Sequence, residues 1–257
     1  MNTRPLNLSP YAVVEGRRRR RLGRRLLRDL SSVLIISGLL LVLDAAVTLL
    51  WQEPLTALVA TIEHGSIDQS LLNRPLPLST LDRRALSGIL GDPQRIAYLA
   101  RKELRTLRPG QAVGRITIPH IGVDFIVVQG TDETDLIKGP GHYPSTALPG
   151  MGETVAIAGH RTTYLAPFRH IDALRPGDRI DLRLPYGRFV YVVQYHRIVL
   201  PTSWWVTNNV GYDRLVLSAC NPLYSAAQRI VVFARLTSAV ALGEARASVA
   251  PGAGPRG

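Results

Sequence analysis

The feature that most constrains this chain is a long apolar stretch close behind its N-terminus. Val33 to Trp51 are nearly all apolar, with the sequence VLIISGLLLVLDAAVTLLW. A helix rises 1.5 Å per residue, so these residues would span roughly 28 Å, about the thickness of a bilayer's hydrocarbon core. We therefore expect a transmembrane anchor over residues 33–51, with Trp51 at an interface where aromatic side chains are common.

Arginines immediately before this stretch predict its orientation. Residues 1–28 contain nine arginines and one acidic residue, Glu15, which accounts for +8 of the formal net charge of +12. Positive residues stay on the cytoplasmic side of a membrane, so residues 1–32 should be cytoplasmic and everything after Trp51 extracellular. The other 229 residues carry only about +4. We therefore read the basic character as a topology signal and do not expect a nucleic-acid partner.

One feature of the apolar stretch disagrees with a membrane anchor. Asp44 lies inside it, and a charge at the centre of such a helix costs about 2.5–3.5 kcal/mol. A cleaved signal peptide is the competing interpretation. We prefer an uncleaved, single-pass anchor in the cell membrane, because the stretch is long for a signal peptide and no clean small-x-small cleavage site follows it.

The chain contains a single cysteine, Cys220. One cysteine excludes an internal disulfide and a zinc cluster built from cysteines. A lone thiol in an exported protein is either a small buried hydrophobic residue or a group used in chemistry. The 19 carboxylates show no spaced Asp-Gly metal loop, so we expect no metal and no calcium requirement.

Residues 52–107 are mixed in character and punctuated by prolines. Apolar residues recur at helical spacing in Asp82–Leu90 and Pro93–Thr106. We expect an extracellular stalk with helical segments. A solvated spacer and a lid that docks on the following domain would look alike in sequence.

Residues 108–237 have a different sequence pattern, in which β-branched apolar runs alternate with residues typical of turns. Such runs predict short strands that close into a β-barrel or pack as a sandwich. The expected strands are Val113–Ile118, Val123–Val128, Thr154–Ala158, Arg179–Leu184, Arg188–Leu200, Arg214–Ser218 and Arg229–Leu236. Short helices are expected near Glu133–Lys138 and Leu165–Leu174, and residues 238–257 are expected to form a disordered tail.

Three ionisable residues sit at the edges of these strands and suggest acyl transfer. His160 and Cys220 each end an apolar run, and Arg229 opens one. A thiolate can attack a peptide carbonyl to form a thioester, and a histidine can move the protons. An arginine stays charged and can stabilise the oxyanion. Arg161 and Arg214 are alternative sources of that charge.

At these residues the chain resembles a known family. The segments GPGHYPSTALPG (139–150) and AIAGHRTTYLAPF (156–168) are similar to the catalytic-histidine region of class E sortases. VLSACNP (216–222) resembles the family's Thr-Leu-x-Thr-Cys motif, with Val216 and Ala219 in place of threonines. RIVVFARL (229–236) resembles the strand that carries the family's arginine. The likeness covers about half of the chain, from Val113 to Leu236.

This resemblance implies an eight-stranded sortase β-barrel and a cysteine transpeptidase that needs no cofactor. Cys220 would be the nucleophile, His160 its proton partner and Arg229 the charge stabiliser. Candidate substrate-binding residues are His142, Tyr164 and Ala219. The family cleaves a C-terminal sorting signal, LPxTG or LAxTG, between Thr and Gly, and passes the acyl group to an amine of a peptidoglycan precursor. A Gram-positive-type cell wall is implied.

Other functions remain compatible with the sequence. A pilin-polymerising sortase would use a lysine of another subunit as its acceptor. A membrane-tethered barrel that binds peptides without catalysis is favoured by Ala219, which replaces the motif's threonine. A cysteine hydrolase would differ only in letting water outcompete amines. The Ser-His-Gly-Cys pattern of L,D-transpeptidases is not found in the chain.

Overall fold

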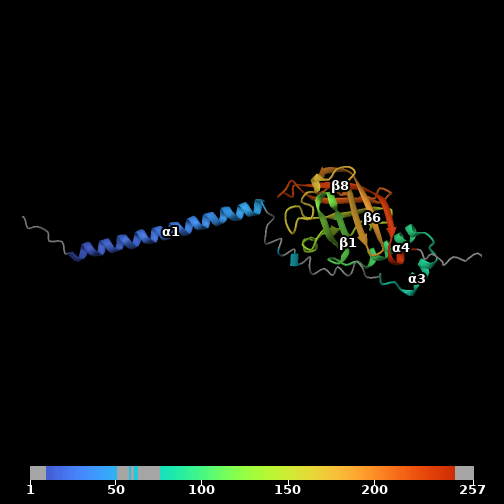
Figure 1. Cartoon of the computed structure of the whole chain (residues 1–257), viewed down its shortest axis with the longest axis horizontal. Coiled ribbons are helices and arrows are strands. Elements are labelled where there is room, and N and C mark those ends of the chain that lie inside the picture. The colour runs from blue at the N-terminus through green and yellow to red at the C-terminus, as the bar shows by residue number, and fades with distance from the viewer. Residues whose placement is uncertain (1–9, 51–57, 59–60, 63–75, 247–257) are drawn as a thin grey trace, which may run out of the picture. The chain divides into compact units, whose positions relative to one another are not determined.

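A computed structural model describes residues 10–50, 58, 61–62 and 76–246 (Figure 1). The chain divides into two compact units, Met1–Trp51 and Gln52–Gly257. The described part of the first unit is one helix, α1 (Pro10–Leu50). Its segment Leu27–Val47 is long and apolar enough to cross a membrane, judged by length and composition alone. The expected interfacial residue Trp51 lies outside the described residues.

The second unit is built on a closed barrel of eight strands, which confirms the predicted fold class. Its strand order is β1-β2-β3-β4-β7-β8-β6-β5. The strands are β1 (Ala112–Ile118), β2 (Val123–Gln129), β3 (Gly141–His142), β4 (Thr154–Ala158), β5 (Arg179–Leu184), β6 (Gly187–Val199), β7 (Arg214–Asn221) and β8 (Gln228–Ala241). Within residues 76–246 the helices are α3 (Thr80–Ser87), α4 (Asp92–Thr106) and α5 (Glu133–Leu136), with 3-10 turns η2 (Pro119–Ile121), η3 (Ile171–Ala173), η4 (Trp204–Thr207) and η5 (Gly243–Ala245).

Strand β7 is covered on both faces, which explains its nearly continuous apolar run. Leu215 and Leu217 point into the main core of the barrel. Val216 lies on the outer face, where it joins a second, smaller apolar cluster with Val231 and Phe233 of β8. Successive strand residues alternate between faces, so the residues of β7 and β8 with this parity all face outward.

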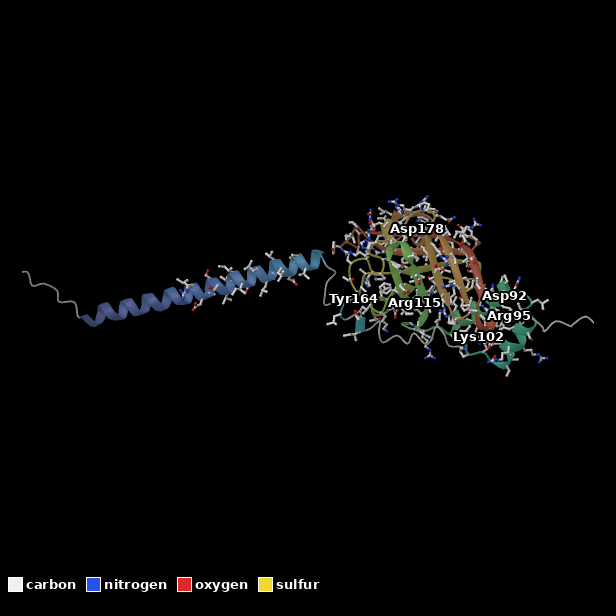
Figure 2. The ribbon with its side chains drawn as sticks, viewed as in Figure 1. Asp92, Arg95, Lys102, Arg115, Tyr164 and Asp178 are labelled. Atoms are coloured by element: carbon white, nitrogen blue, oxygen red, sulfur yellow. The ribbon has the colours of Figure 1, made fainter. Side chains whose placement is uncertain are left out.

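Helix α4 packs against the barrel, whereas the sequence of residues 52–107 left both a solvated spacer and a docked segment open. Its apolar residues Ile96, Leu99 and Ala100 are at most 3% exposed and share the main core with the barrel strands. The buried Arg95 donates hydrogen bonds to backbone carbonyls of Glu244 and other residues around α4. Figure 2 shows Arg95 at one end of the barrel. Helix α4 packs on the barrel because its apolar stripe needs a partner surface.

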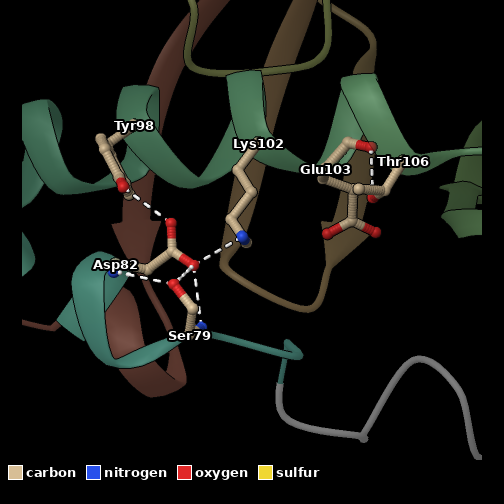
Figure 3. A network of polar contacts seen from close by, with 6 residues as sticks. All are labelled: Ser79, Asp82, Tyr98, Lys102, Glu103 and Thr106. Carbon is tan, nitrogen blue, oxygen red and sulfur yellow. Dashed lines mark hydrogen bonds and ion pairs between the residues drawn. The ribbon is translucent and has the colours of Figure 1, made fainter.

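A polar network ties α3 to α4 (Figure 3). Ser79 and Asp82 form a reciprocal capping box at the start of α3. The same Asp82 carboxylate accepts hydrogen bonds from the Tyr98 hydroxyl at 2.8 Å and from the Lys102 ammonium at 2.6 Å. These donors hold the pKa of Asp82 well below its usual range, with Lys102 the largest cause. The carboxylate therefore remains ionised and pins both helices together.

Two strands differ from the prediction. Strand β3 was not predicted, because two residues are too few to show a periodic pattern. Strand β8 extends to Ala241, past the expected start of the tail at Ser238, because its last residues pair with Gly187–Val190 of β6. Residues 247–257 of the expected tail lie outside the described residues.

The helix expected at Leu165–Leu174 is wrong for most of its length. Tyr164, Leu165 and Ala166 adopt positive φ angles of 51°, 63° and 41°, and only Ile171–Ala173 form a 3-10 turn. Pro167 accounts for part of this, since a proline disfavours the helical conformation of the residue before it. The segment is therefore an irregular loop that follows His160 directly.

Candidate active site

The pairing of β4 with β7 brings His160 close to Cys220. The two strands run parallel, with Ala158 opposite Ser218, and the Gly159 amide donates a hydrogen bond to the Ser218 carbonyl at 3.0 Å. His160 and Cys220 each lie two residues beyond this last pair. Because the strands run in the same direction, both residues emerge at the same end of the barrel.

Cys220 lies directly opposite Arg229 in the antiparallel pair of β7 and β8. Side chains opposite each other on one face have Cβ atoms about 4.5–5.5 Å apart. Cys220 has the parity of Val216, and Arg229 has the parity of Val231, so both point to the outer face. Cys220 and Arg229 therefore lie side by side on this outer face, at the end of the barrel where His160 emerges.

The His160 side chain is partly buried, and one of its ring nitrogens has no hydrogen-bond partner among the described residues. Its Nε2 is buried and makes no hydrogen bond within the described ranges of the chain. Burial lowers the pKa of His160, and the charge of Glu133 opposes this shift. The ring lies 5.0 Å from the Tyr164 ring, centroid to centroid, at an interplanar angle of 50°. The imidazole is therefore largely neutral near pH 7 and able to exchange a proton.

The backbone around His160 is held by two close contacts. The Phe168 amide donates a hydrogen bond to the His160 carbonyl at 3.0 Å. A Cβ added to Gly159 would lie 2.6 Å from Cδ2 of the fully buried Phe168 ring, so only glycine fits at this position. These contacts fold the irregular 161–170 loop back against the end of β4.

Arg229 has donors left to offer a substrate. Its Nη1 donates to the backbone carbonyls of Ala226 and Gln228, both at 2.9 Å. Its other guanidinium nitrogens have no hydrogen-bond partner among the residues that the structure describes. Cys220 is a free cysteine of intermediate exposure. A bound carbonyl could therefore meet both the thiol and an available N–H group.

The two alternative arginines are engaged elsewhere. The Arg161 side chain is 4% exposed and all three of its guanidinium nitrogens have partners. Arg214 donates from Nη2 to the carbonyls of Val206 and Asn208, at 3.0 and 2.7 Å, and its guanidinium lies over the Phe233 ring. Of the three candidates, Arg229 is the one with free donors beside the thiol.

The structure separates the three candidate substrate-binding residues. Tyr164 lies beside His160 at the site. His142 is 1% exposed, its Nδ1 pairs with Gln129 at 2.8 Å and its Nε2 with the Ala147 carbonyl at 2.9 Å. Burial lowers the pKa of His142 to about 4. Neither ring nitrogen of His142 is left for a substrate.

Ala219 faces the barrel interior, on the side of β7 opposite to Cys220. It is 3% exposed and belongs to the main core. Its side chain therefore packs with apolar residues and does not line the outer face that carries Cys220 and Arg229. Sequence reasoning missed Glu133 on α5, whose charge acts on His160. No local sequence pattern links two residues that are this far apart in the chain.

Among the described residues, no group of three or more His, Cys, Asp or Glu side chains could hold a metal ion. The side chains at this end of the barrel include a thiol, an imidazole with a free nitrogen and a guanidinium with free donors. Together these groups can provide a nucleophile, a proton carrier and a stabiliser of negative charge. That combination suits transfer of an acyl group through a thioester.

Comparisons with known proteins agree with this chemistry. The model of the sortase domain family matches residues 116–237. Sortase D of Bacillus subtilis is 33% identical over 130 residues, which are 49% of this chain and 64% of that protein. Sortase SrtE1 of Streptomyces coelicolor is 28% identical over 147 residues, which are 51% of this chain and 42% of that protein. The chain thus spans less than two thirds of the length of these relatives.

A solved structure shows the same fold. The crystal structure of sortase E1 from Streptomyces coelicolor, with a tripeptide in its active site, superposes with a TM-score of 0.50. The sequences are 25% identical, and the match covers 53% of this chain and 94% of that chain. The likeness therefore covers about half of this chain and nearly the whole of that one.

Proposed function

Since this chain belongs to the sortase family of transpeptidases, we propose that it is a membrane-anchored cysteine transpeptidase that cleaves a C-terminal sorting signal between Thr and Gly. The signal would be of the LPxTG or LAxTG kind, and a cell-wall amine would accept the acyl group. The observation that carries this proposal is the strand register, which pairs Cys220 with Arg229 and ends with Ala158 opposite Ser218, two residues before His160 and Cys220.

The first half-reaction would form a thioester on Cys220. Neutral His160 takes the proton of the Cys220 thiol. The resulting thiolate attacks the carbonyl carbon of the threonine, and the free N–H groups of Arg229 stabilise the oxyanion that develops. The C–N bond to glycine then breaks as protonated His160 donates its proton to the departing amine. The C-terminal fragment leaves, and the N-terminal fragment stays on the sulfur.

The second half-reaction would regenerate the enzyme. An incoming amine attacks the thioester carbonyl and gives up a proton to neutral His160, and the thiolate departs from the new amide. Burial lowers the pKa of His160, so the neutral form needed to accept this proton predominates near pH 7. Neutral His142 cannot replace it, since both of its ring nitrogens are engaged.

The apolar helix α1 supports an anchored location. Its segment Leu27–Val47 follows the arginine-rich residues, so the barrel would lie on the extracellular side. Exported proteins and wall precursors are present on that side. A class E identity is supported by the likeness to SrtE1 and by the histidine-region motif.

Intact-mass measurement of the acyl-enzyme tests the proposal. The full chain in detergent is incubated with peptides that carry Leu-Pro-x-Thr-Gly or Leu-Ala-x-Thr-Gly. We expect a mass gain equal to the acyl half, its absence in Cys220→Ala, and discharge by an added amine such as a lysine side chain. A folded protein that neither gains mass nor cleaves either peptide would count against the proposed substrate class.

A further inference from the structure

Three polar residues next to the proposed catalytic residues form a hydrogen-bond network. Arg161 follows His160, Asn221 follows Cys220, and Gln228 precedes Arg229. Arg161 Nη1 donates to Asn221 Oδ1 at 2.9 Å. Asn221 Nδ2 donates in turn to Gln228 Oε1 at 3.2 Å. Each catalytic candidate is therefore next in sequence to a member of this network.

Arg161 makes the largest number of contacts in this network. The same Nη1 also approaches the Cys220 carbonyl at 3.4 Å. Nη2 pairs with the Asp172 carboxylate at 2.7 Å, and Nε donates to the Arg169 carbonyl at 3.3 Å. The Arg161 side chain is 4% exposed, and Asp172 offsets its charge. A guanidinium with three engaged nitrogens in a buried position defines one geometry for the groups around it.

This hydrogen-bond network lies where the backbone hydrogen bonds between the strands end. The last register pair of β4 and β7 is Ala158 with Ser218, and one further bond joins Gly159 to Ser218. His160 lies past that bond, so the ladder does not set its spacing from Cys220. Arg161 supplies the next link between the two segments. On the other side, Asn221 and Gln228 are the last register pair of β7 and β8, beside Cys220 and Arg229.

We propose that Arg161, Asn221 and Gln228 form a positioning relay that sets the spacing of His160, Cys220 and Arg229. The relay rests on the proposed acyl-transfer function, and its members act through their neighbours without touching the reacting atoms. Reaction rates depend steeply on such spacing, because a displacement of about 1 Å can cost on the order of 100-fold in rate. Substrate affinity should depend on it much less.

Kinetics of relay variants test this inference. Arg161→Met and Asn221→Leu should each lower kcat for thioester formation at least about tenfold, with KM within about twofold of the wild type. Arg161→Lys should not restore the rate, because one ammonium cannot reach Asp172, Asn221 and the Cys220 carbonyl together. The double variant of Arg161 and Asn221 should be no slower than the worse single variant, since both remove the same link.

Arg95→Met is the matched control. Arg95 is also a buried arginine bonded to backbone carbonyls, and it lies at the end of the barrel away from Tyr164 (Figure 2). Its loss should lower the melting temperature and leave kcat unchanged. If Arg95→Met lowers kcat as much as Arg161→Met at equal loss of stability, the relay is no more than a stabilising contact and the inference is overturned.

Alkylation of Cys220 by iodoacetamide gives a readout that needs no sorting peptide. The wild type should react faster than His160→Ala at pH 7, and Arg161→Met and Asn221→Leu should lose that difference. Folded relay variants that react at the wild-type rate would overturn the relay, as would a wild type that reacts no faster than His160→Ala. If no peptide acylates the wild type but the alkylation series behaves as expected, the proposed substrate fails and the relay stands.

Discussion

Cys220 and Arg229 face each other across the β7–β8 pair, in register and on the outer face of the barrel. This relationship places a permanent positive charge beside the single thiol of the chain. A shift of one residue in this register would turn one of the two side chains into the core. The closed barrel prevents such a shift, because β7 and β8 are each bonded to a neighbour on both sides.

Replacement of Arg229 tests whether the free N–H donors stabilise the oxyanion. We expect Arg229→Gln to lower kcat for thioester formation about 10²–10³-fold, because a lost oxyanion donor typically costs that much. KM should change far less. Arg235→Gln is the control, since Arg235 lies on the same strand opposite Arg214, away from Cys220. Equal losses in the two variants would argue for a general charge effect.

Removal of the Tyr164 ring should raise the pKa of His160. Burial lowers that pKa, and the Tyr164 ring covers one side of the imidazole. Tyr164→Ala admits water, so the pKa should move up toward the unperturbed value of about 6.5. Tyr164→Phe keeps the ring and should leave the pKa in place. NMR titration of the imidazole in a Cys220→Ala background measures both.

Glu133→Gln should shift the same pKa in the opposite direction. The negative charge of Glu133 favours the protonated imidazole and opposes the effect of burial. Its removal should therefore lower the pKa of His160 further. The same titration, run at low and high salt, should show a smaller difference at high salt if the interaction is through solvent. A rise in the pKa would show that Glu133 acts by another route.

Glu103 should make the stability of the barrel domain depend on pH. Its side chain is buried, Oε2 has no partner among the described residues, and burial raises its pKa to about 7. The protonated form is favoured by folding, so its contribution is present below about pH 4.5 and is lost as pH rises to about 7. At 1.36 kcal/mol per pKa unit, the wild type should lose on the order of 3 kcal/mol across this window.

Urea unfolding of Glu103→Gln at several pH values checks this expectation. The amide cannot ionise, so the pH-dependent loss should be much smaller in the variant than in the wild type. Glu133→Gln, which alters an exposed carboxylate, serves as the control and should keep the wild-type loss. Identical pH profiles for wild type and Glu103→Gln would mean that Glu103 is hydrated or paired in solution.

Gly159→Ala should damage both stability and activity. The new methyl group would meet the buried Phe168 ring at 2.6 Å, and the backbone that carries His160 would have to move. Such overpacking costs about 1–3 kcal/mol. Gly88→Ala is the control, because its nearest neighbour would be an oxygen at 3.6 Å. Thermal unfolding and the acylation rate, measured on both variants, separate the local clash from a general effect of alanine.

Local patterns predicted most of the barrel. Strands such as Thr154–Ala158 and Arg179–Leu184 begin and end where the alternation of apolar and turn-forming residues begins and ends. Local patterns did not predict the structure where a segment is held by residues that are distant in sequence. The two-residue strand β3 exists because β2 and β4 flank it. The loop after His160 is irregular because Phe168 and Pro167 constrain it more strongly than helix propensity does.

The amino-acid sequence by itself determined that one thiol, one suitably placed histidine and several arginines were available, and that an apolar segment of membrane-spanning length precedes them. These are properties of residue type and local spacing, which a chain carries before it folds. Only the tertiary structure decided which arginine faces the thiol, that His142 and Ala219 point away from the site, and that Arg161 joins segments 60 residues apart. Such choices depend on strand register and burial, which arise only when distant segments pack together.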